Sequence, residues 1–142
     1  MRIPAHVLKQ ITAHAAADYP AECCGLLVGR EGTVSRCEPV RNLRAAERCD
    51  RFELDPLGHV RVFESARARG ERIIGCYHSH PDGVARPSSL DRQLAQRFGG
   101  PFGYLVVAVH PGQGASVYGG LVAPDGEIVP APLDIQGEIE TA

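Results

Sequence analysis

The sequence contains no long apolar run. None of its 142 residues belongs to a stretch approaching the roughly 18 apolar residues that a membrane-spanning helix needs. The N-terminus, Met1 to Pro4, lacks the apolar core of a secretion signal. We therefore expect a cytoplasmic protein that has no membrane partner.

An excess of charge of one sign is also missing. The 15 Lys and Arg residues and the 17 Asp and Glu residues are interspersed, which leaves a formal net charge of −2 and an isoelectric point of about 6.3. Proteins that bind nucleic acids usually present a basic stripe, and this sequence has none. We therefore expect no nucleic acid among its partners.

The cysteines do not form a recognisable framework. Their number, five, is odd, and no two of them have the C-x-x-C spacing that is typical of thiolate zinc sites. The sequence therefore favours neither a disulfide-stabilised fold nor a cysteine-ligated zinc, and we expect most cysteines to be small core residues. They are Cys23, Cys24, Cys37, Cys49 and Cys76.

Repeats, linkers and low-complexity segments are absent as well. A chain of 142 residues can form one domain that buries about 68–70% of the surface exposed in its unfolded form. We predict a single domain over residues 1–135. Residues 136–142 are expected to form a short frayed tail.

The hydrophobic pattern predicts an α/β fold. Helical spacing of apolar residues, together with start and stop signals, predicts helices from Pro4 to about Asp18, from Asp55 to about Gly70, and from Asp91 to Phe98. Alternating or continuous apolar runs predict strands within residues 20–29, 33–40, 51–54, 73–80, 104–109, 115–123 and 127–135. The sum is a central mixed β-sheet flanked by about three helices. A polar loop, residues 42–50, is expected to be mobile and to flank the functional site.

The most informative stretch is the end of the apolar strand that leads into His78, Ser79 and His80. Because side chains alternate along a strand, His78 and His80 are expected on one face and Ser79 on the other. Their backbones would lie about 6.5–7 Å apart, which lets one nitrogen of each ring reach a single ion at about 2.0–2.1 Å. An isolated His-x-His pair is more often solvated or part of a core, so a metal site needs a further ligand.

Asp91 is the candidate for that ligand. Pro81 ends the strand, a loop rich in Gly and Pro turns the chain back, and Ser88 or Ser89 can cap a helix whose first turn holds Asp91. Two histidines and one carboxylate, with a fourth position open to water, are typical of catalytic zinc sites. Ser88 and Asp91 also form a possible capping box, and the same ligands would accept Fe²⁺ or Co²⁺.

These residues resemble the signature of a known family. The H-x-H-x7-S-x2-D pattern that runs from His78 to Asp91 resembles the motif of the JAMM (MPN+) zinc metallopeptidases, above all their short stand-alone prokaryotic members. The segment around Glu22 is similar to the P-x-E-x-x-G-L-L-x-G segment in which that family presents its catalytic glutamate. The resemblance covers nearly the whole chain and implies a JAMM/MPN-like fold. It also implies zinc ligands and catalytic residues at five positions: His78, His80 and Asp91 for the metal, Glu22 and Ser88 for catalysis.

The residue types at these positions suit hydrolysis. A bound Zn²⁺ lowers the pKa of a water toward about 7 and polarises a carbonyl group. A carboxylate that does not bind the metal can take the proton of that water and give it to the leaving amine, and Glu22 is the candidate for this base. The hydroxyl of Ser88 can donate a hydrogen bond to the oxygen that becomes negatively charged.

The resemblance also implies a class of substrate. JAMM relatives cleave peptide or isopeptide bonds after the C-terminal Gly-Gly of ubiquitin-like proteins, and short prokaryotic members release an amino acid or a longer extension from a small sulfur-carrier protein. We expect this reaction here. One alternative is an isopeptidase that removes such a modifier from protein lysines. Another is a catalytically silent MPN scaffold, against which the complete set of site residues argues. A zinc nucleoside deaminase is dismissed because its Pro-Cys-x-x-Cys ligand pair is missing.

Overall fold

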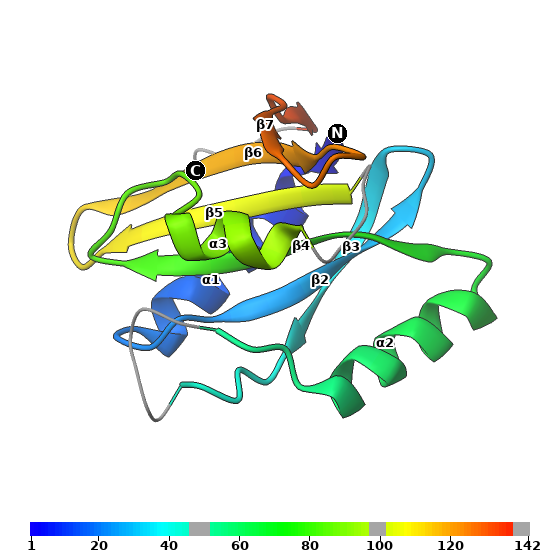
Figure 1. Cartoon of the computed structure of the whole chain (residues 1–142), viewed down its shortest axis with the longest axis horizontal. Coiled ribbons are helices and arrows are strands. Elements are labelled where there is room, and N and C mark those ends of the chain that lie inside the picture. Colours follow the sequence, from blue (N-terminus) through cyan, green and yellow to red (C-terminus); the bar gives the residue numbers. More distant parts are fainter. Residues whose placement is uncertain (46–51, 97–101, 138–142) are drawn as a thin grey trace.

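The structure is a computed structural model that describes residues 1–45, 52–96 and 102–137 (Figure 1). Its helices are α1 (Ala5–Asp18), α2 (Pro56–Ala68) and α3 (Ser89–Ala95). Its strands are β1 (Arg2–Pro4), β2 (Cys24–Arg30), β3 (Thr33–Val40), β4 (Arg72–Pro81), β5 (Phe102–His110), β6 (Gly114–Val122), β7 (Ile128–Pro130) and β8 (Asp134–Gln136).

The strands of the described residues form one sheet in the order β7-β6-β5-β4-β2-β3-β1-β8. β2 pairs antiparallel with β3 and β4, whereas β4 and β5 are parallel. A parallel pair needs a crossover connection, and the segment that contains α3 supplies it. The prediction of an α/β domain with a mixed sheet and three helices is confirmed.

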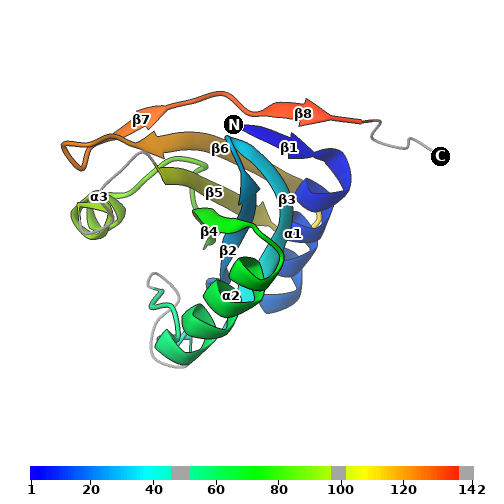
Figure 2. The same cartoon turned by 90° about the vertical axis from the view of Figure 1, so that its right-hand side faces the viewer.

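The sheet separates two hydrophobic cores. Helix α1 packs on one face, where it contributes Val7 and Ile11 to a core that includes Tyr77 of β4. Helices α2 and α3 cover the other face, where the core includes Cys76 of β4. Figure 2 shows α1 on one side of the curled sheet and α2 and α3 on the other. Since Cys76 and Tyr77 are neighbours, each face of β4 belongs to a different core.

The central strand β5 is buried along its whole middle part. Residues 103–109 are all buried, which is typical of a strand that is covered on both faces. Helix α2 begins as expected, because the Asp55 side chain accepts a hydrogen bond from the backbone N–H of Leu57 at 3.1 Å and Pro56 stands in the first turn. These local signals were readable without tertiary information.

The C-terminal strand prediction was wrong in its extent. The strand expected over residues 127–135 is two strands, β7 and β8, which lie at opposite ends of the sheet order. After β7, Ala131 N–H donates to the carbonyl of Gly119 on β6 at 2.9 Å, and at the start of β8 Asp134 N–H donates to the carbonyl of Met1 at 3.0 Å. Pro130 and Pro132 lack a backbone N–H, so a continuous ladder could not form here. β8 instead pairs in parallel with β1, a strand that the sequence pattern did not reveal.

Two further boundaries differ. Of the strand expected over residues 51–54, Arg51 lies outside the described residues, and the described part forms only an isolated bridge between Leu54 and Asn42. The helix expected from Asp91 to Phe98 begins at Ser89, because Ser88 is its N-cap, so the expected cap with Asp91 in the first turn is confirmed. The predicted last residues of this helix lie outside the described part of the chain. Helix ends commonly differ by one or two residues between a prediction from sequence and the structure.

The ends of the chain leave two expectations as predictions. Gln136 is the last residue of β8, and residues 138–142 of the expected tail lie outside the described residues, so the boundary after residue 135 stays a prediction. No helix in the described part of the chain is long and apolar enough to cross a membrane. The expected cytoplasmic location stays a prediction.

Candidate metal centre

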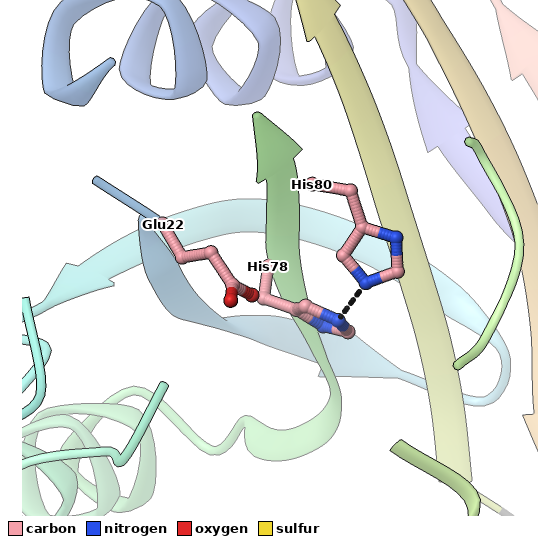
Figure 3. A group of neighbouring side chains, drawn as sticks. All are labelled: Glu22, His78 and His80. Carbon is pink, nitrogen blue, oxygen red and sulfur yellow. Dashed lines mark hydrogen bonds between the residues drawn. The ribbon is translucent and has the colours of Figure 1, made fainter. Parts of the chain in front are cut away.

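The C-terminal end of β4 brings two imidazoles together. His78 and His80 point to the same side of the strand, as the alternation of side chains requires, and their Nε2 atoms lie 3.1 Å apart (Figure 3). His78 is fully buried and His80 is partly buried. Both rings therefore present a nitrogen to one point at the edge of the core.

Asp91 reaches the same point from the first turn of α3. Its Oδ1 atom lies 3.0 Å from Nε2 of His78, and its Oδ2 atom lies 3.0 Å from Nε2 of His80. Asp91 is also the third residue of a capping box, in which Ser88 N–H donates to Oδ2 at 2.8 Å and Asp91 N–H donates to Oγ of Ser88 at 3.1 Å. The capping and the contact with the histidines thus occur together, because the cap holds the carboxylate in place.

The donor atoms fit a cation. Nδ1 of His80 lies 2.9 Å from the carbonyl oxygen of Val84, which only accepts hydrogen bonds, so the ring proton is on Nδ1 and the lone pair is on Nε2. That lone pair faces Oδ2 of Asp91 at 3.0 Å, which is unfavourable unless a proton or a metal ion lies between the two atoms. Three ligands at about 2.0–2.1 Å from a tetrahedral ion are roughly 3.3 Å apart, a few tenths of an ångström more than observed.

Aromatic rings hold His78 in place. Phe52 stacks on the imidazole with ring centroids 4.3 Å apart, and the ring of Tyr104 approaches it edge-on at 5.4 Å. Among the described residues, the buried Nδ1 atom of His78 has no hydrogen-bond partner. Burial lowers the pKa of His78, against the opposing effect of its hydrogen bond with Asp91. The ring is therefore neutral at physiological pH, the state in which an imidazole binds a metal.

The carboxylate of Asp91 is held in its charged form. Burial by itself would raise the pKa of Asp91, but the adjacent imidazoles of His78 and His80 lower it far below its usual value. The backbone N–H of Ser88 acts in the same direction. A carboxylate that stays ionised can act as a metal ligand over the whole physiological pH range.

Glu22 lies just before β2 and is 2% exposed. One carboxylate oxygen of Glu22 and one ring nitrogen each of His78 and His80 all lie within 4.8 Å of one another, a grouping that could hold a metal ion (Figure 3). The same separation also accommodates one bridging water, since two hydrogen bonds of about 2.8 Å span such a distance. Glu22 can therefore act either as a ligand or as a base beside the ion.

Ser88 is exposed and stands at the start of α3. Its Oγ atom accepts the hydrogen bond from Asp91 N–H, which uses a lone pair and leaves the hydroxyl proton available. The hydroxyl can thus donate to a group bound beside the histidines. The structure therefore brings Glu22 and the three candidate ligands together and places Ser88 at their margin.

Two residues near the centre were not identified from the sequence. Phe52 covers His78, and Asn42 donates a hydrogen bond from Nδ2 to the backbone carbonyl of Glu22 at 2.9 Å. Asn42 begins the loop of residues 42–50 that was expected to be mobile and to flank the site, but it is buried, and residues 46–50 of that loop lie outside the described residues. Phe52 belongs to the strand expected over residues 51–54. The one sequence signal was that Asn42, the only asparagine in the chain, lies between two predicted elements. This signal alone is too weak to assign the residue to the site.

A family model described as prokaryotic homologues of the JAB domain matches residues 4–118 of the chain. Among curated proteins, the chain is 40% identical over 91 residues to the desampylase of Haloferax volcanii, with 63% of this chain and 65% of that protein covered. It is 36% identical over 94 residues to the CysO-cysteine peptidase of Mycobacterium tuberculosis, with 66% and 64% covered. A probable TtuB-protein conjugate cleaving protease of Thermus thermophilus is 32% identical over 94 residues, with 66% and 62% covered. Each alignment thus spans slightly less than two thirds of the relative.

Solved structures share the whole fold. A protein from Desulfitobacterium hafniense matches with a TM-score of 0.83 and 30% identity, over 99% of this chain and 96% of that one. A JAB1/MPN domain protein from Archaeoglobus fulgidus matches with a TM-score of 0.57 and 25% identity, over 95% and 98%. The family match includes Glu22 and all candidate metal ligands, since these lie between residues 4 and 118.

Proposed function

Because the chain belongs to the family of prokaryotic homologues of the JAB domain, we propose that it is a zinc-dependent peptidase acting on a small ubiquitin-like or sulfur-carrier protein. In this proposal it hydrolyses the peptide bond after the C-terminal Gly-Gly and releases an amino acid or a short extension. The observation that carries the proposal is the convergence of His78, His80 and Asp91 at 3.0–3.1 Å beside the buried carboxylate of Glu22.

His78, His80 and Asp91 would hold the ion. Two imidazoles and one carboxylate are a common donor set for catalytic zinc, and Fe²⁺ or Co²⁺ would also be accepted. When bound, the ion would lower the pKa of a water molecule and polarise the scissile carbonyl. Neutral His78 and ionised Asp91 are the protonation states that this role requires.

Glu22 would move the proton. Its buried carboxylate is close enough to the histidines to accept a proton from the attacking water and to deliver it to the leaving amine. General acid–base catalysis of this kind contributes roughly 10²–10⁴ in rate. The hydroxyl of Ser88 would donate a hydrogen bond to the carbonyl oxygen as this oxygen gains charge, by analogy with oxyanion-hole donors that are worth about 2.7–4 kcal/mol each.

The substrate class rests on the relatives. One is named a CysO-cysteine peptidase, which supports release of an amino acid from the end of a small protein. Another is named a probable TtuB-protein conjugate cleaving protease, which favours a second candidate function: removal of a modifier from other proteins by isopeptide cleavage. The two functions differ in their products, a free amino acid or peptide in the first and a released protein in the second.

The test is an intact-mass assay. The purified zinc-loaded protein is incubated with a small sulfur-carrier protein from the same genome that is extended by a few residues beyond its Gly-Gly. Glu22→Gln serves as the matched control, because it keeps the size of the side chain and removes its basicity. We expect the carrier to lose mass until it ends at Gly-Gly, and to remain intact with the control variant.

Other outcomes separate the alternatives. An intact carrier, combined with cleavage of a lysine-linked conjugate, would replace the first function by the isopeptidase. Absence of both activities in a protein that binds zinc stoichiometrically would favour a scaffold. Absence of both activities in a protein that binds no zinc would contradict the metal centre as well.

A further inference from the structure

The peptide group between Glu22 and Cys23 is held by two side chains. Its carbonyl oxygen, which belongs to Glu22, accepts a hydrogen bond from Nδ2 of Asn42 at 2.9 Å. Its N–H group, which belongs to Cys23, donates to Oγ of Ser79 at 2.8 Å. Both partners are buried, with 8% of Asn42 and 0% of Ser79 exposed. Most buried peptide groups pair with other peptide groups in a helix or a sheet, so this arrangement is unusual.

The orientation of the Asn42 amide is determined by its other contacts. Its Oδ1 atom accepts hydrogen bonds from the backbone N–H groups of Arg44 and Glu53, each at 2.9 Å. Since both of these partners only donate, the atom that they contact must be the amide oxygen. The NH₂ group therefore faces the carbonyl of Glu22, and the hydrogen bond to Glu22 cannot be lost by a flip of the amide.

Ser79 connects Glu22 to the strand that carries the histidines. It lies between His78 and His80 and points to the opposite face of β4. Besides the bond from Cys23 N–H to its hydroxyl, the backbone N–H of Ser79 donates to the carbonyl of Cys23 at 3.1 Å. Any displacement of the Glu22 backbone relative to the two histidines must therefore break contacts with the residue between them.

We propose that Asn42 and Ser79 are positioning residues, which fix the carboxylate of Glu22 relative to His78 and His80 through the peptide group that follows Glu22. Glu22 precedes the first residue of β2 by two positions, so the sheet alone does not determine its backbone. The two side chains approach this peptide group from separate segments, one after β3 and one in β4. The inference rests on the proposed role of Glu22 as the base.

Substitutions at the two positions each remove one of the hydrogen bonds to the peptide group between Glu22 and Cys23. Ser79→Ala removes the acceptor for Cys23 N–H and leaves the volume of the site almost unchanged. Asn42→Asp keeps an oxygen for Arg44 and Glu53 but removes the donor to Glu22, and Asn42→Ala serves as a second variant without the added charge. Ser116→Ala is the matched control, because Ser116 is an exposed strand residue on β6.

We expect kcat to fall by roughly 10- to 100-fold in each positioning variant, because a displacement of about 1 Å in a reacting group has an effect of this size. KM and the zinc content should stay within about twofold of the unsubstituted protein, since neither hydrogen bond involves a metal ligand or the surface open to substrate. Amide hydrogen exchange of Cys23 should accelerate in Ser79→Ala and remain unchanged in Ser116→Ala.

The deciding measurement repeats the substitutions in the Glu22→Gln background. A residue that acts through Glu22 should have no further effect on the residual kcat once the base is gone, because coupled residues are not additive. The same fold-loss in both backgrounds would overturn the inference and indicate a general structural role. Unchanged kcat in both Asn42→Ala and Ser79→Ala would overturn it as well.

The turnover of Glu22→Gln and that of the positioning variants distinguish failure of the proposed function from failure of the inference. Full turnover by Glu22→Gln would overturn the proposed role of the base, and with it the premise of the inference. Loss of turnover in Glu22→Gln, together with normal turnover in the positioning variants, would overturn the inference alone. Loss of turnover in Glu22→Gln and in the variants of Asn42 and Ser79, with no additive effect when they are combined, would support both the proposed function and the inference.

Discussion

The two faces of β4 use similar side chains in opposite ways. On the face toward α1, the hydroxyl of Tyr77 lies 2.8 Å from Nδ1 of His14, and the hydroxyl of Ser79 accepts the N–H of Cys23. On the other face, His78 and His80 direct their Nε2 atoms at each other and at Asp91, at 3.0–3.1 Å. Polar groups on the first face are paired within the chain, whereas those on the second converge on one point.

The difference separates a face whose polar groups are satisfied by one another from a face whose polar groups are arranged for chemistry. A buried polar group is costly unless it is paired, so the face toward α1 is arranged as expected for a stable core. Electron-rich atoms that face one another at 3.0 Å are less favourable in the absence of a cation. Such local conflicts between stability and arrangement are expected at functional sites. Substitution of Tyr77 on the first face and of the histidines on the second should therefore separate stability from activity. Ser79 is the exception on the first face, because its hydroxyl holds the peptide group that follows Glu22.

The largest effect is expected for His80→Ala. The substitution removes one of three ligands, so we expect loss of most bound zinc and of detectable turnover. Metal content measured by mass spectrometry under native conditions checks the first, and the peptidase assay checks the second. His110→Ala is the control, because His110 donates from Nε2 to the carbonyl of Gly83 at 2.8 Å and lies outside the candidate ligand set. Retention of one zinc per chain in His80→Ala would contradict the ligand assignment.

Glu22→Gln should have the next largest effect. The amide cannot accept the proton of the water, so kcat should fall by roughly 10²–10⁴ while zinc content and melting temperature stay near those of the unsubstituted protein. Kinetics with the extended carrier protein, together with thermal unfolding, provide the measurement. A near-normal rate would remove Glu22 from the role of base, and loss of zinc would indicate that Glu22 is a ligand instead.

Ser88→Ala should reduce kcat by about 10²–10³ if its hydroxyl stabilises the developing oxyanion. The loss of the cap on α3 should also reduce stability by about 1 kcal/mol. The two effects can be separated with Ser88→Gly, since glycine is a better cap than alanine but lacks the hydroxyl. Recovery of turnover in Ser88→Gly would show that the helix cap, not the hydroxyl, is what activity requires.

On the opposite face, Tyr77→Phe should affect stability alone. It removes the hydrogen bond with His14, which should lower the free energy of unfolding by about 1–2 kcal/mol. Turnover and zinc content should not change, because the Tyr77 hydroxyl is directed toward α1. Urea denaturation and the peptidase assay check the two parts. A drop in kcat comparable to that of Glu22→Gln would mean that the two faces are not separate.

The smallest effect is expected at the other end of β4, where Glu71 pairs with Arg36 of β3. Hydrogen bonds from Ser35 and Arg36 lower the pKa of Glu71 below its usual 4.5, against the opposing effect of burial. A carboxylate whose pKa is lowered by folding stabilises the protein above pH 4.5, and this contribution is lost as the pH falls through the folded-state value. Glu71→Gln should therefore flatten the pH dependence of unfolding below about pH 5, by about 1 kcal/mol or less. An unchanged slope would contradict this role.

Much of the centre could be predicted because its parts are local. The alternation of a strand places His78 and His80 together, and the Ser88 cap places Asp91 in the first turn of α3, so three donors follow from a stretch of 14 residues. Glu22 lies far from them in the sequence and was assigned through the family resemblance. Its position depends on the pairing of β2 with β4, where Cys24 lies opposite His78.

The contacts that hold the base could not be predicted at all. Asn42 contacts Glu22 from the predicted loop, and Phe52 contacts His78 from the short predicted strand that follows the loop. Neither a polar residue nor an aromatic one reveals its tertiary partner from the sequence. The pairing of β1 with β8 was missed for a different reason: strands of three residues are too short to show a periodic pattern in the sequence.

The secondary structure around the centre, the chemical types of its donors and their order along β4 and α3 follow from the sequence alone. These features depend on neighbouring residues, through side-chain alternation and helix capping. Which distant side chains meet there depends on the folded arrangement, in which Asn42 and Ser79 hold the peptide group that follows Glu22 and Phe52 covers His78. Such contacts depend on how the sheet curls and on which strands become neighbours, and these result from burying both hydrophobic cores at once.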